Sequence, residues 1–205
     1  DSGVLAQTGL TGEQALSLLV YTYQYSGLTE ESPQQVLGKV CLERNTLRMT
    51  KVRPFIVYML SAMRKLGAVK TDKPVYRGVD GSMLNFSRYT PDNVVTWTSF
   101  SWATANRDEA LQYTASAKRP VLFEIIGNFR AYNIGKITGD NDSLILEMGT
   151  QFRVVSAVDN FDFVYITLEA SPKYIADKYT EKMNSSLSEG YTVFFSTSTR
   201  CSHTT

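Results

Sequence analysis

The sequence has little histidine and no long apolar run, and each shortage narrows the classes of protein that it can encode. Its single histidine, His203, lies in a polar tail without a neighbouring cysteine or aspartate cluster, so no metal site is predicted. No apolar stretch approaches the ~20 residues that a membrane-spanning helix needs. The 21 basic and 20 acidic residues nearly cancel, which argues against a global field that would recruit nucleic acid or an anionic membrane. Any anion site must therefore be local.

Length and hydrophobic content fit a single domain over residues 1–205. A chain of 205 residues, 43% of them hydrophobic, can bury one substantial core but is too short for two ordinary domains. We expect a monomer.

The first part of the chain, about residues 11–67, is predicted to be helical. Thr11-Gly12-Glu13-Gln14 has the form of a capping box, and apolar residues follow it at helical spacing. Two more helices are predicted, over Pro33 to Leu42 and over about Lys51 to Leu66, the second ended by Gly67. The apolar positions of that last helix share one face and are expected to be core: Phe55, Tyr58, Met59, Met63 and Leu66.

Residues from about 74 to 170 are predicted to form a β-rich core. The expected strands are Val75 to Gly78, Val94 to Ser101, Pro120 to Ile126, Ala131 to Ile134, Ser143 to Met148, Gln151 to Val158 and Phe161 to Glu169. A short helix over Asn106 to Ala115, with Thr104 as a candidate N-cap, interrupts them. Helices followed by many short strands predict an α+β fold with an antiparallel-rich sheet core.

The C-terminal extension, 171–205, is expected to add two elements. A helix is predicted from Pro172 to about Met183 and a last strand over Tyr191 to Ser196.

Three ordered segments carry the most information about function. They are Tyr76-Arg77-Gly78, Trp97-Thr98-Ser99-Phe100-Ser101, and the run from Leu144 to Val154 that contains Gly149-Thr150-Gln151-Phe152. In this order and spacing they resemble the strand motifs of the arginine-serine-glutamate class of mono-ADP-ribosyltransferases, and are similar to the ecto-ADP-ribosyltransferases. The resemblance covers about residues 13–170. It implies an ADP-ribosyltransferase-like fold, in which a helical N-terminal part packs on a two-sheet core.

Arg77 is the first candidate ligand-binding residue. A strand arginine between an aromatic residue and a glycine can present its planar guanidinium to a phosphate or ribose, while Gly78 allows close approach to the backbone. Taken alone, Tyr76-Arg77-Gly78 fits a solvated surface arginine better. The resemblance reverses that preference, because it implies that Tyr76, Arg77 and Gly78 bind the nicotinamide dinucleotide NAD.

Ser101 is the second candidate. In the family that the chain resembles, a Ser/Thr cluster at this place orients the catalytic glutamate and contacts the nicotinamide ribose, and aromatic residues before it form the pocket wall. The resemblance therefore assigns Phe100 and Ser101 to cofactor binding. Trp102-Ala103 departs from the family pattern, and for Thr104 a helix-capping role is as well supported as a ligand role.

The catalytic glutamate is missing from its expected position. In the family a Glu-x-Glu pair precedes the aliphatic run; counted back from Gly149, the same places hold Asn141-Asp142-Ser143. Cleavage of the nicotinamide-ribose bond develops positive charge that a fixed carboxylate stabilises, and Ser143 cannot supply it. Glu147 is the alternative carboxylate, but it lies ~13 Å farther along an extended strand. A solvated edge position fits it better.

Phe129 and Tyr132 are further aromatic candidates. They follow a predicted strand, in the loop that in the resembled family curls over nicotinamide, where a ring could stack. Core packing is the more favoured interpretation for both side chains.

The resemblance implies NAD as the substrate, no metal, and an ADP-ribosyltransferase or NAD glycohydrolase activity if the chain is active. The competing hypothesis is an inactive family member that serves as a binding or surface-interaction protein, and the residues alone leave both open. A protein acceptor is compatible with the first hypothesis. A nucleic-acid partner is not expected, since no basic stripe with interleaved aromatics was recognised.

The cysteines, Cys41 and Cys201, bear on localisation. Composition alone leaves open whether they are unrelated thiols or a disulfide. Secreted and surface-anchored members of the resembled family carry a bridge of this kind, which favours a disulfide and an extracellular or cell-surface protein.

Overall fold

The structure is a computed structural model that describes residues 2–22, 32–43, 46–70 and 73–170. The chain divides into two compact units, Asp1–Ser171 and Pro172–Thr205. The second unit lies outside the described residues, and with it the helix and strand expected in the C-terminal extension.

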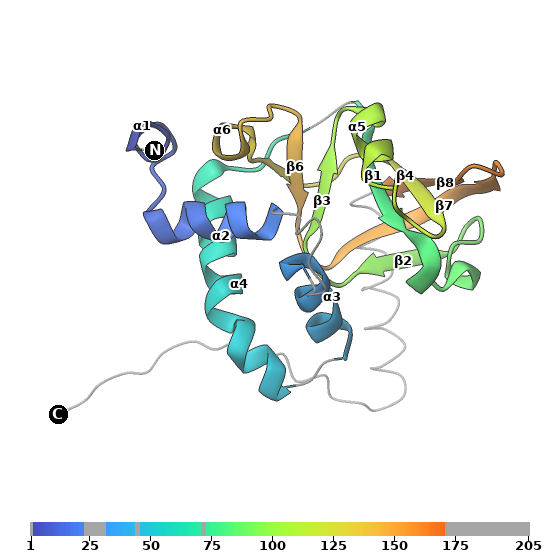
Figure 1. Cartoon of the computed structure of the whole chain (residues 1–205), viewed down its shortest axis with the longest axis horizontal. Helices are drawn as coiled ribbons and strands as arrows, with labels where there is room; N and C mark the ends of the chain where they lie inside the picture. The colour runs from blue at the N-terminus through green and yellow to red at the C-terminus, as the bar shows by residue number, and fades with distance from the viewer. Residues whose placement is uncertain (1, 23–31, 44–45, 71–72, 171–205) are drawn as a thin grey trace, which may run out of the picture. The chain divides into compact units, whose positions relative to one another are not determined.

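Helices dominate the first third of the described chain and strands the remainder (Figure 1), which confirms the α+β prediction. The α-helices are α1 (Ser2–Thr8), α2 (Gly12–Thr22), α3 (Pro33–Glu43), α4 (Thr46–Leu66), α5 (Arg107–Gln112) and α6 (Gly135–Thr138). The strands are β1 (Val75–Asp80), β2 (Val94–Trp97), β3 (Ser101–Thr104), β4 (Pro120–Gly127), β5 (Ala131–Asn133), β6 (Ser143–Leu146), β7 (Thr150–Asp159) and β8 (Val164–Ala170). Two short 3-10 turns, η1 (Gly81–Met83) and η2 (Phe86–Arg88), follow β1.

The strands form one sheet in the order β2-β7-β8-β4-β1-β3-β6-β5. All neighbours are antiparallel except β4 and β8. A single residue pair, Tyr76 with Thr104, joins β1 to β3 and so connects a five-strand half to a three-strand half. The two-sheet core expected from the sequence is therefore one sheet in the structure, with its two halves joined at this pair.

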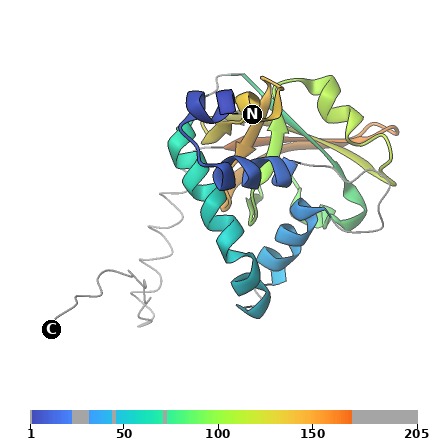
Figure 2. The same cartoon turned by 60° about the vertical axis from the view of Figure 1, so that its left-hand side comes forward.

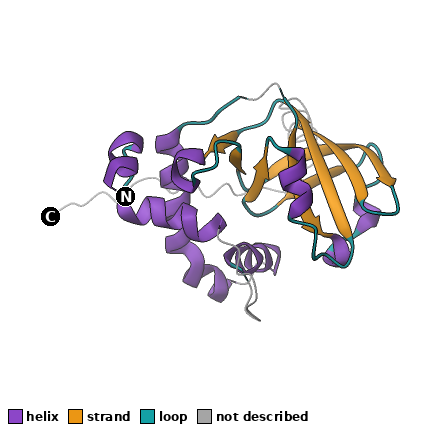
Figure 3. Ribbon diagram, turned by 45° about the horizontal axis from the view of Figure 1, so that its top comes forward, coloured by secondary structure: helices purple, strands orange, loops and turns teal. Residues whose placement is uncertain are grey.

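Two hydrophobic clusters stabilise the unit. One lies on the sheet and includes Phe123, Phe152 and Ile166. The other packs α2 and α4 against Phe100 and Ile145. Figures 1 and 3 show helices α1 to α4 gathered beside the β3-β6-β5 end of the sheet, with α5 set apart from them.

The N-terminal helices follow the sequence signals closely. The predicted capping box is confirmed: the Gln14 amide donates to Thr11 Oγ1, and the Thr11 amide donates to Gln14 Oε1 at 2.9 Å. Helix α4 begins at Thr46, earlier than expected, and contains Pro54. Tyr58 was wrongly predicted to be core; its side chain is 44% exposed.

Several boundaries in the β-rich part differ from the predictions. The strand expected over 94–101 is interrupted, so that β2 ends at Trp97 and a separate strand, β3, begins at Ser101. Thr104 does not cap α5, since Asn106 Oδ1 accepts the amides of Asp108 and Glu109. Helices α1 and α6 were missed because short helices leave little periodicity.

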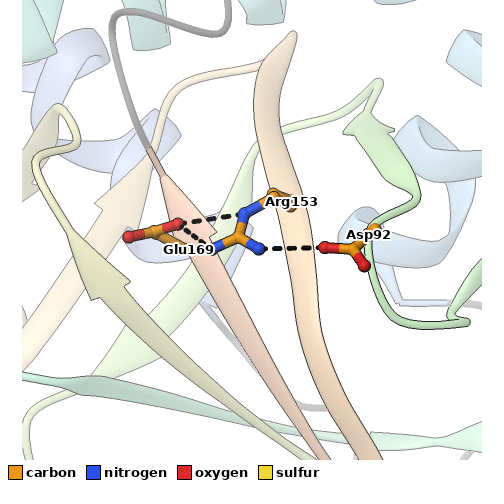
Figure 4. Close-up of polar contacts among 3 residues, drawn as sticks. All are labelled: Asp92, Arg153 and Glu169. Atoms are coloured by element: carbon orange, nitrogen blue, oxygen red, sulfur yellow. Dashed lines mark hydrogen bonds and ion pairs between the residues drawn. The ribbon is translucent and has the colours of Figure 1, made fainter.

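An ion-pair network ties β7 to β8 and to the loop before β2 (Figure 4). Arg153 donates through Nε and Nη2 to Glu169 Oε2, the latter at 2.7 Å, and through Nη1 to Asp92 Oδ1 at 3.0 Å. Arg153 and Glu169 are direct cross-strand partners, so strand pairing brings these two opposite charges together.

Candidate functional site

Arg77 lines a cavity of about 330 Å³ next to β1 and the β2-β3 connection. Its Nη1 donates to the carbonyl oxygen of Trp102 at 2.7 Å, across the gap where β1 and β3 diverge. Arg88, exposed on η2, lines the same cavity, and so do Trp97 and Ser101. The cavity thus brings two guanidinium groups together with aromatic and hydroxyl groups.

The Arg77 guanidinium is a desolvated cation. Burial lowers its pKa from the ordinary value, and the nearby hydroxyl groups of Tyr21 and Tyr89 counter part of that shift. Among the described residues no carboxylate lies within 4 Å of it. Its Cζ lies 5.6 Å from the centre of the Trp97 ring, a cation-π distance. A desolvated arginine facing a cavity without a carboxylate partner is suited to an anion such as a phosphate.

The other two residues of the Tyr-Arg-Gly segment do not line this cavity. Tyr76 points to the opposite face of β1, where it interacts with Glu124, its cross-strand partner. At Gly78, an added Cβ would lie 1.9 Å from the carbonyl oxygen of Ala110 on α5. The structure therefore gives Gly78 a packing role: its missing side chain allows α5 to lie on β1.

The residues expected around the nicotinamide ribose are dispersed. Ser101, 4% exposed, lies with Arg77 in the cavity. Phe100 packs edge-on against Tyr21 in the helical core, with the ring centres 6.1 Å apart. Phe129 and Tyr132 belong to the sheet core and the helical core respectively, as the packing interpretation favoured. Of these four residues, only Ser101 borders the Arg77 cavity.

Ser143 borders a different cavity, of about 650 Å³, between β3, β6, α5 and α2. Its Oγ accepts a hydrogen bond from the Trp102 indole Nε1 at 3.2 Å and donates one to Asp140 Oδ2 at 2.6 Å. The Trp102 side chain points away from that of Ser101, because successive strand residues face opposite sides. Trp102 therefore stands between the two cavities, with its carbonyl bound to Arg77 and its indole bound to Ser143.

Two carboxylates line the Ser143 cavity. Glu109 Oε2 accepts from Thr104 Oγ1 at 2.6 Å, and Asp140 lies close enough to hydrogen-bond with Glu109. Desolvation, followed by repulsion from Asp140 and Asp142, raises the pKa of Glu109. Tyr113 stacks on Trp102 beside them, with ring centres 4.3 Å apart. This cavity is acidic and aromatic, whereas the Arg77 cavity is basic.

Glu147 borders neither cavity. It follows the end of β6 in the turn to β7, half-buried, and accepts a hydrogen bond from the Tyr132 hydroxyl at 3.4 Å. Among the residues that the structure describes, no group of three His, Cys, Asp or Glu side chains is arranged to hold a metal ion.

Sequence reasoning missed three contributors to the site. Arg88 lies in a 3-10 turn without a motif, and Glu109 lies on a helix that the motif search did not include. Trp102 was noted only as a departure from the family pattern. The sequence spacing between Arg77 and Trp102 could not show that Trp102 contacts both Arg77 and Ser143.

Structural comparisons identify the architecture. HopU1, an ADP-ribosyltransferase of Pseudomonas syringae pv. tomato, is similar with a TM-score of 0.65 and 17% identity over 83% of this chain and 84% of its own. The chain has the ADP-ribosyltransferase fold. The Vis toxin, an ADP-ribosyltransferase from Vibrio splendidus, is similar with a TM-score of 0.56 and 18% identity, covering 83% of this chain and 86% of its own.

A third similar ADP-ribosyltransferase-fold structure is exoenzyme S from Pseudomonas aeruginosa, solved with human 14-3-3 protein beta and bound to carba-NAD. Its TM-score is 0.60 and its identity 16%, over 82% of this chain and 78% of its own. No family model and no curated protein matches the sequence.

Proposed function

We propose that this chain binds NAD through the Arg77 cavity and cleaves it at no more than a background rate. The observation that carries the binding half is Arg77 itself, a desolvated guanidinium without a carboxylate partner among the described residues, on a chain with the ADP-ribosyltransferase fold. The NAD diphosphate would occupy this cavity, with Arg88 and the hydroxyl of Ser101 at its border.

The absence of efficient turnover rests on Ser143. This residue occupies the place where the resemblance implies the catalytic glutamate, and its hydroxyl is already engaged by Trp102 and Asp140. The nearby carboxylates, Glu109 and Asp140, belong to the cavity on the other side of β3 from Arg77. The Arg77 cavity is lined by the carboxylate of Asp80, which is exposed and already accepts the backbone amides of Ser82 and Arg119. We therefore expect it to stabilise a developing oxocarbenium ion only weakly.

Calorimetric titration with NAD tests the binding half. Arg77→Ala should weaken NAD binding at least tenfold, because a charge-assisted contact of about 1.5 to 3 kcal/mol is lost. Arg53→Ala, at an exposed arginine that lines neither cavity, is the matched control and should leave the affinity unchanged. Equal NAD affinity in the native chain and in Arg77→Ala would show that the assigned role is wrong.

Release of nicotinamide tests the turnover half. The native chain should release it at background, and Glu147→Gln should change nothing, because Glu147 borders neither cavity. Robust release that disappears in Glu147→Gln would make Glu147 the catalytic carboxylate and this chain an ordinary enzyme, with a protein acceptor to be sought.

The second candidate function is a binding or surface-interaction protein that does not use NAD. The hydrogen bond between Trp102 and Ser143 favours it, since it fills the place of the catalytic group with a packed aromatic ring. Failure of the native chain to bind millimolar NAD would support this function instead.

An extracellular or cell-surface location is proposed on the cysteines alone. Cys41 lies buried on α3, and Cys201 lies outside the described residues, so their pairing stays a prediction. Intact mass under non-reducing conditions, after expression in an oxidising compartment, tests it: two free thiols would contradict both the bridge and this location.

A further inference from the structure

Helix α4 is strongly basic, although the chain as a whole is nearly neutral. From Thr46 to Leu66 it contains five basic residues and no acidic one, although the chain has a net charge of only +1. Arg48 pairs with Glu43. The other four are Lys51, Arg53, Arg64 and Lys65, and none has a carboxylate within 4 Å among the described residues.

These four cations lie on one side of the helix. Viewed down the helix axis at 100° per residue, they follow one another in the order Arg53, Arg64, Lys65, Lys51. Together they cover an arc of about 160°. All four side chains are exposed. The opposite side holds the buried residues Met59, Ala62 and Met63, which pack in the helical core. We call the exposed arc the outer face of α4. In Figure 2 this helix, in teal, runs at the left of the coloured ribbon and α2 crosses it.

Large apolar side chains lie among the cations of the outer face. Leu47 is 72% exposed, Val57 is 54% exposed and Tyr58 is 44% exposed. They are distributed from the first turn to the middle of a helix that is about 30 Å long at 1.5 Å per residue. Of the four cations, Lys65 donates through Nζ to the carbonyl oxygen of Gly9 at 3.0 Å. Exposed aliphatic residues interleaved with cations that have no carboxylate partner among the described residues mark an interaction surface more strongly than either feature alone.

We propose that the outer face of α4 docks on an anionic lipid surface. Its four cations complement the negative charge of lipid headgroups, to which each basic side chain near the surface contributes attraction. Leu47, Val57 and the ring of Tyr58 would enter the boundary between headgroups and acyl chains, while the long Lys and Arg side chains keep their charges at headgroup level.

The aliphatic side chains decide in favour of lipid over a nucleic acid. Phosphate backbones bind cations, and bases stack on aromatic rings, but neither interaction uses an exposed leucine or valine. A lipid interface removes Leu47 and Val57 from water at the same time as it pairs with the cations. Among the described helices none is long and apolar enough to cross a bilayer.

Sedimentation of the full chain with vesicles tests the proposal. Vesicles of phosphatidylcholine with about a third phosphatidylserine should bind the chain, and pure phosphatidylcholine should not. Binding should weaken as salt rises, because the Debye length falls from about 10 Å at 0.1 M to about 3 Å at 1 M. Absence of binding to the anionic vesicles at low salt would overturn the proposal.

Two double variants separate the charged from the apolar contribution. Lys51→Glu with Arg53→Glu should weaken vesicle binding at least tenfold, and Leu47→Ser with Val57→Ser at least fivefold. Their matched controls are Arg130→Glu with Lys136→Glu, two exposed cations off the helix, and Val158→Ser, an exposed valine on β7; both controls should bind like the native chain. Circular dichroism verifies that each variant is folded.

Three outcomes would overturn the proposal. One is equal loss of vesicle binding in the charge variant and in its control, which would mean that net charge alone acts. Another is undiminished binding by the apolar double variant. The third is tight binding of a duplex DNA probe that the charge variant loses and the apolar variant keeps, which would assign the outer face of α4 to nucleic acid.

Discussion

The indole Nε1 of Trp102 donates to the Oγ of Ser143 at 3.2 Å. Both side chains are buried, with exposed fractions of 6% and 3%. This bond orients the large ring of Trp102 on the β6 side of β3, while the carbonyl of the same residue accepts from Arg77. One strand residue therefore connects the basic cavity to the acidic one.

A double-mutant cycle measures the Trp102-Ser143 bond. Trp102→Phe, Ser143→Ala and the double variant should give a coupling free energy of about 1 kcal/mol in urea unfolding, the typical net value of a buried neutral hydrogen bond. The separate loss of the contact from Ser143 to Asp140 cancels in the cycle. A coupling of zero would show that the two residues only pack together.

Ser143→Glu should destabilise the fold. It places a second carboxylate beside Asp140 in a buried position, and an uncompensated buried charge costs about 3 to 5 kcal/mol. We expect the folded-state pKa of the new carboxyl group to be raised by the same environment. The loss of stability from the new charge should therefore be absent below about pH 4.3, the pKa of a glutamate in the unfolded chain. It should develop as the pH rises above that value.

Ser143→Gln is the matched control, since it adds the same bulk without the charge. The difference in unfolding free energy between the Glu and Gln variants, followed from pH 3 to pH 8, isolates the charge. A pH-independent difference would contradict the predicted electrostatic cost.

Gly78→Ala should be among the most damaging single-methyl substitutions in the described chain. The new Cβ would clash with the carbonyl oxygen of Ala110, so α5 must move away from β1, and overpacking of this kind costs about 1 to 3 kcal/mol or more. Gly12→Ala is the control, since nothing lies within 4 Å of its added Cβ in α2. Thermal unfolding should show a large loss for the first variant and none for the second.

Removing the charge of Glu169 should cost more stability than removing that of Asp92. Both pair with Arg153, but the side chain of Asp92 is 85% exposed and that of Glu169 only 33%. Solvent screening leaves about 0 to 1 kcal/mol for an exposed pair. Glu169→Gln should therefore cost about 1 kcal/mol and Asp92→Asn less than half of that, measured by urea unfolding at low salt. The reverse order would show that the loop contact is the stronger one.

Glu109→Gln should stabilise the protein at neutral pH. The folded-state pKa of Glu109 is raised, chiefly by desolvation, so the wild type loses stability as pH rises through that pKa. Glutamine keeps an acceptor for Thr104 Oγ1 but has no charge to desolvate. The variant should unfold at a higher temperature than the wild type at pH 7, and the two should converge below about pH 4.

Asp108→Asn is the control for this effect, because its exposed carboxylate lies in the first turn of the same helix. It should bring no gain in unfolding temperature. A gain of equal size in both variants would attribute the effect to the charge of the whole helix and not to the burial of Glu109.

Local signals in the sequence were enough for much of the fold. The capping box at Thr11, the helix beginning at Pro33 and the strands around Arg77 depend on neighbouring residues, and the structure contains them close to where they were expected. Boundaries that depend on tertiary packing were wrong. The chain breaks between β2 and β3 because Trp97 and Ser101 join different halves of the sheet, and periodicity alone could not show this.

By itself, the sequence predicted the α+β fold class correctly and singled out Arg77 and Ser143 as candidate site residues, because these predictions depend on residue identity, order and short-range spacing. Only the tertiary structure decided which residues meet. Alternation along β3 separates Ser101 from Trp102, so Arg77 and Ser143 face different cavities. The packing of α4 exposes Tyr58 on the same face of the helix as four cations. Such contacts join residues far apart in the chain, and their formation depends on how the sheet pairs and how the helices pack on it.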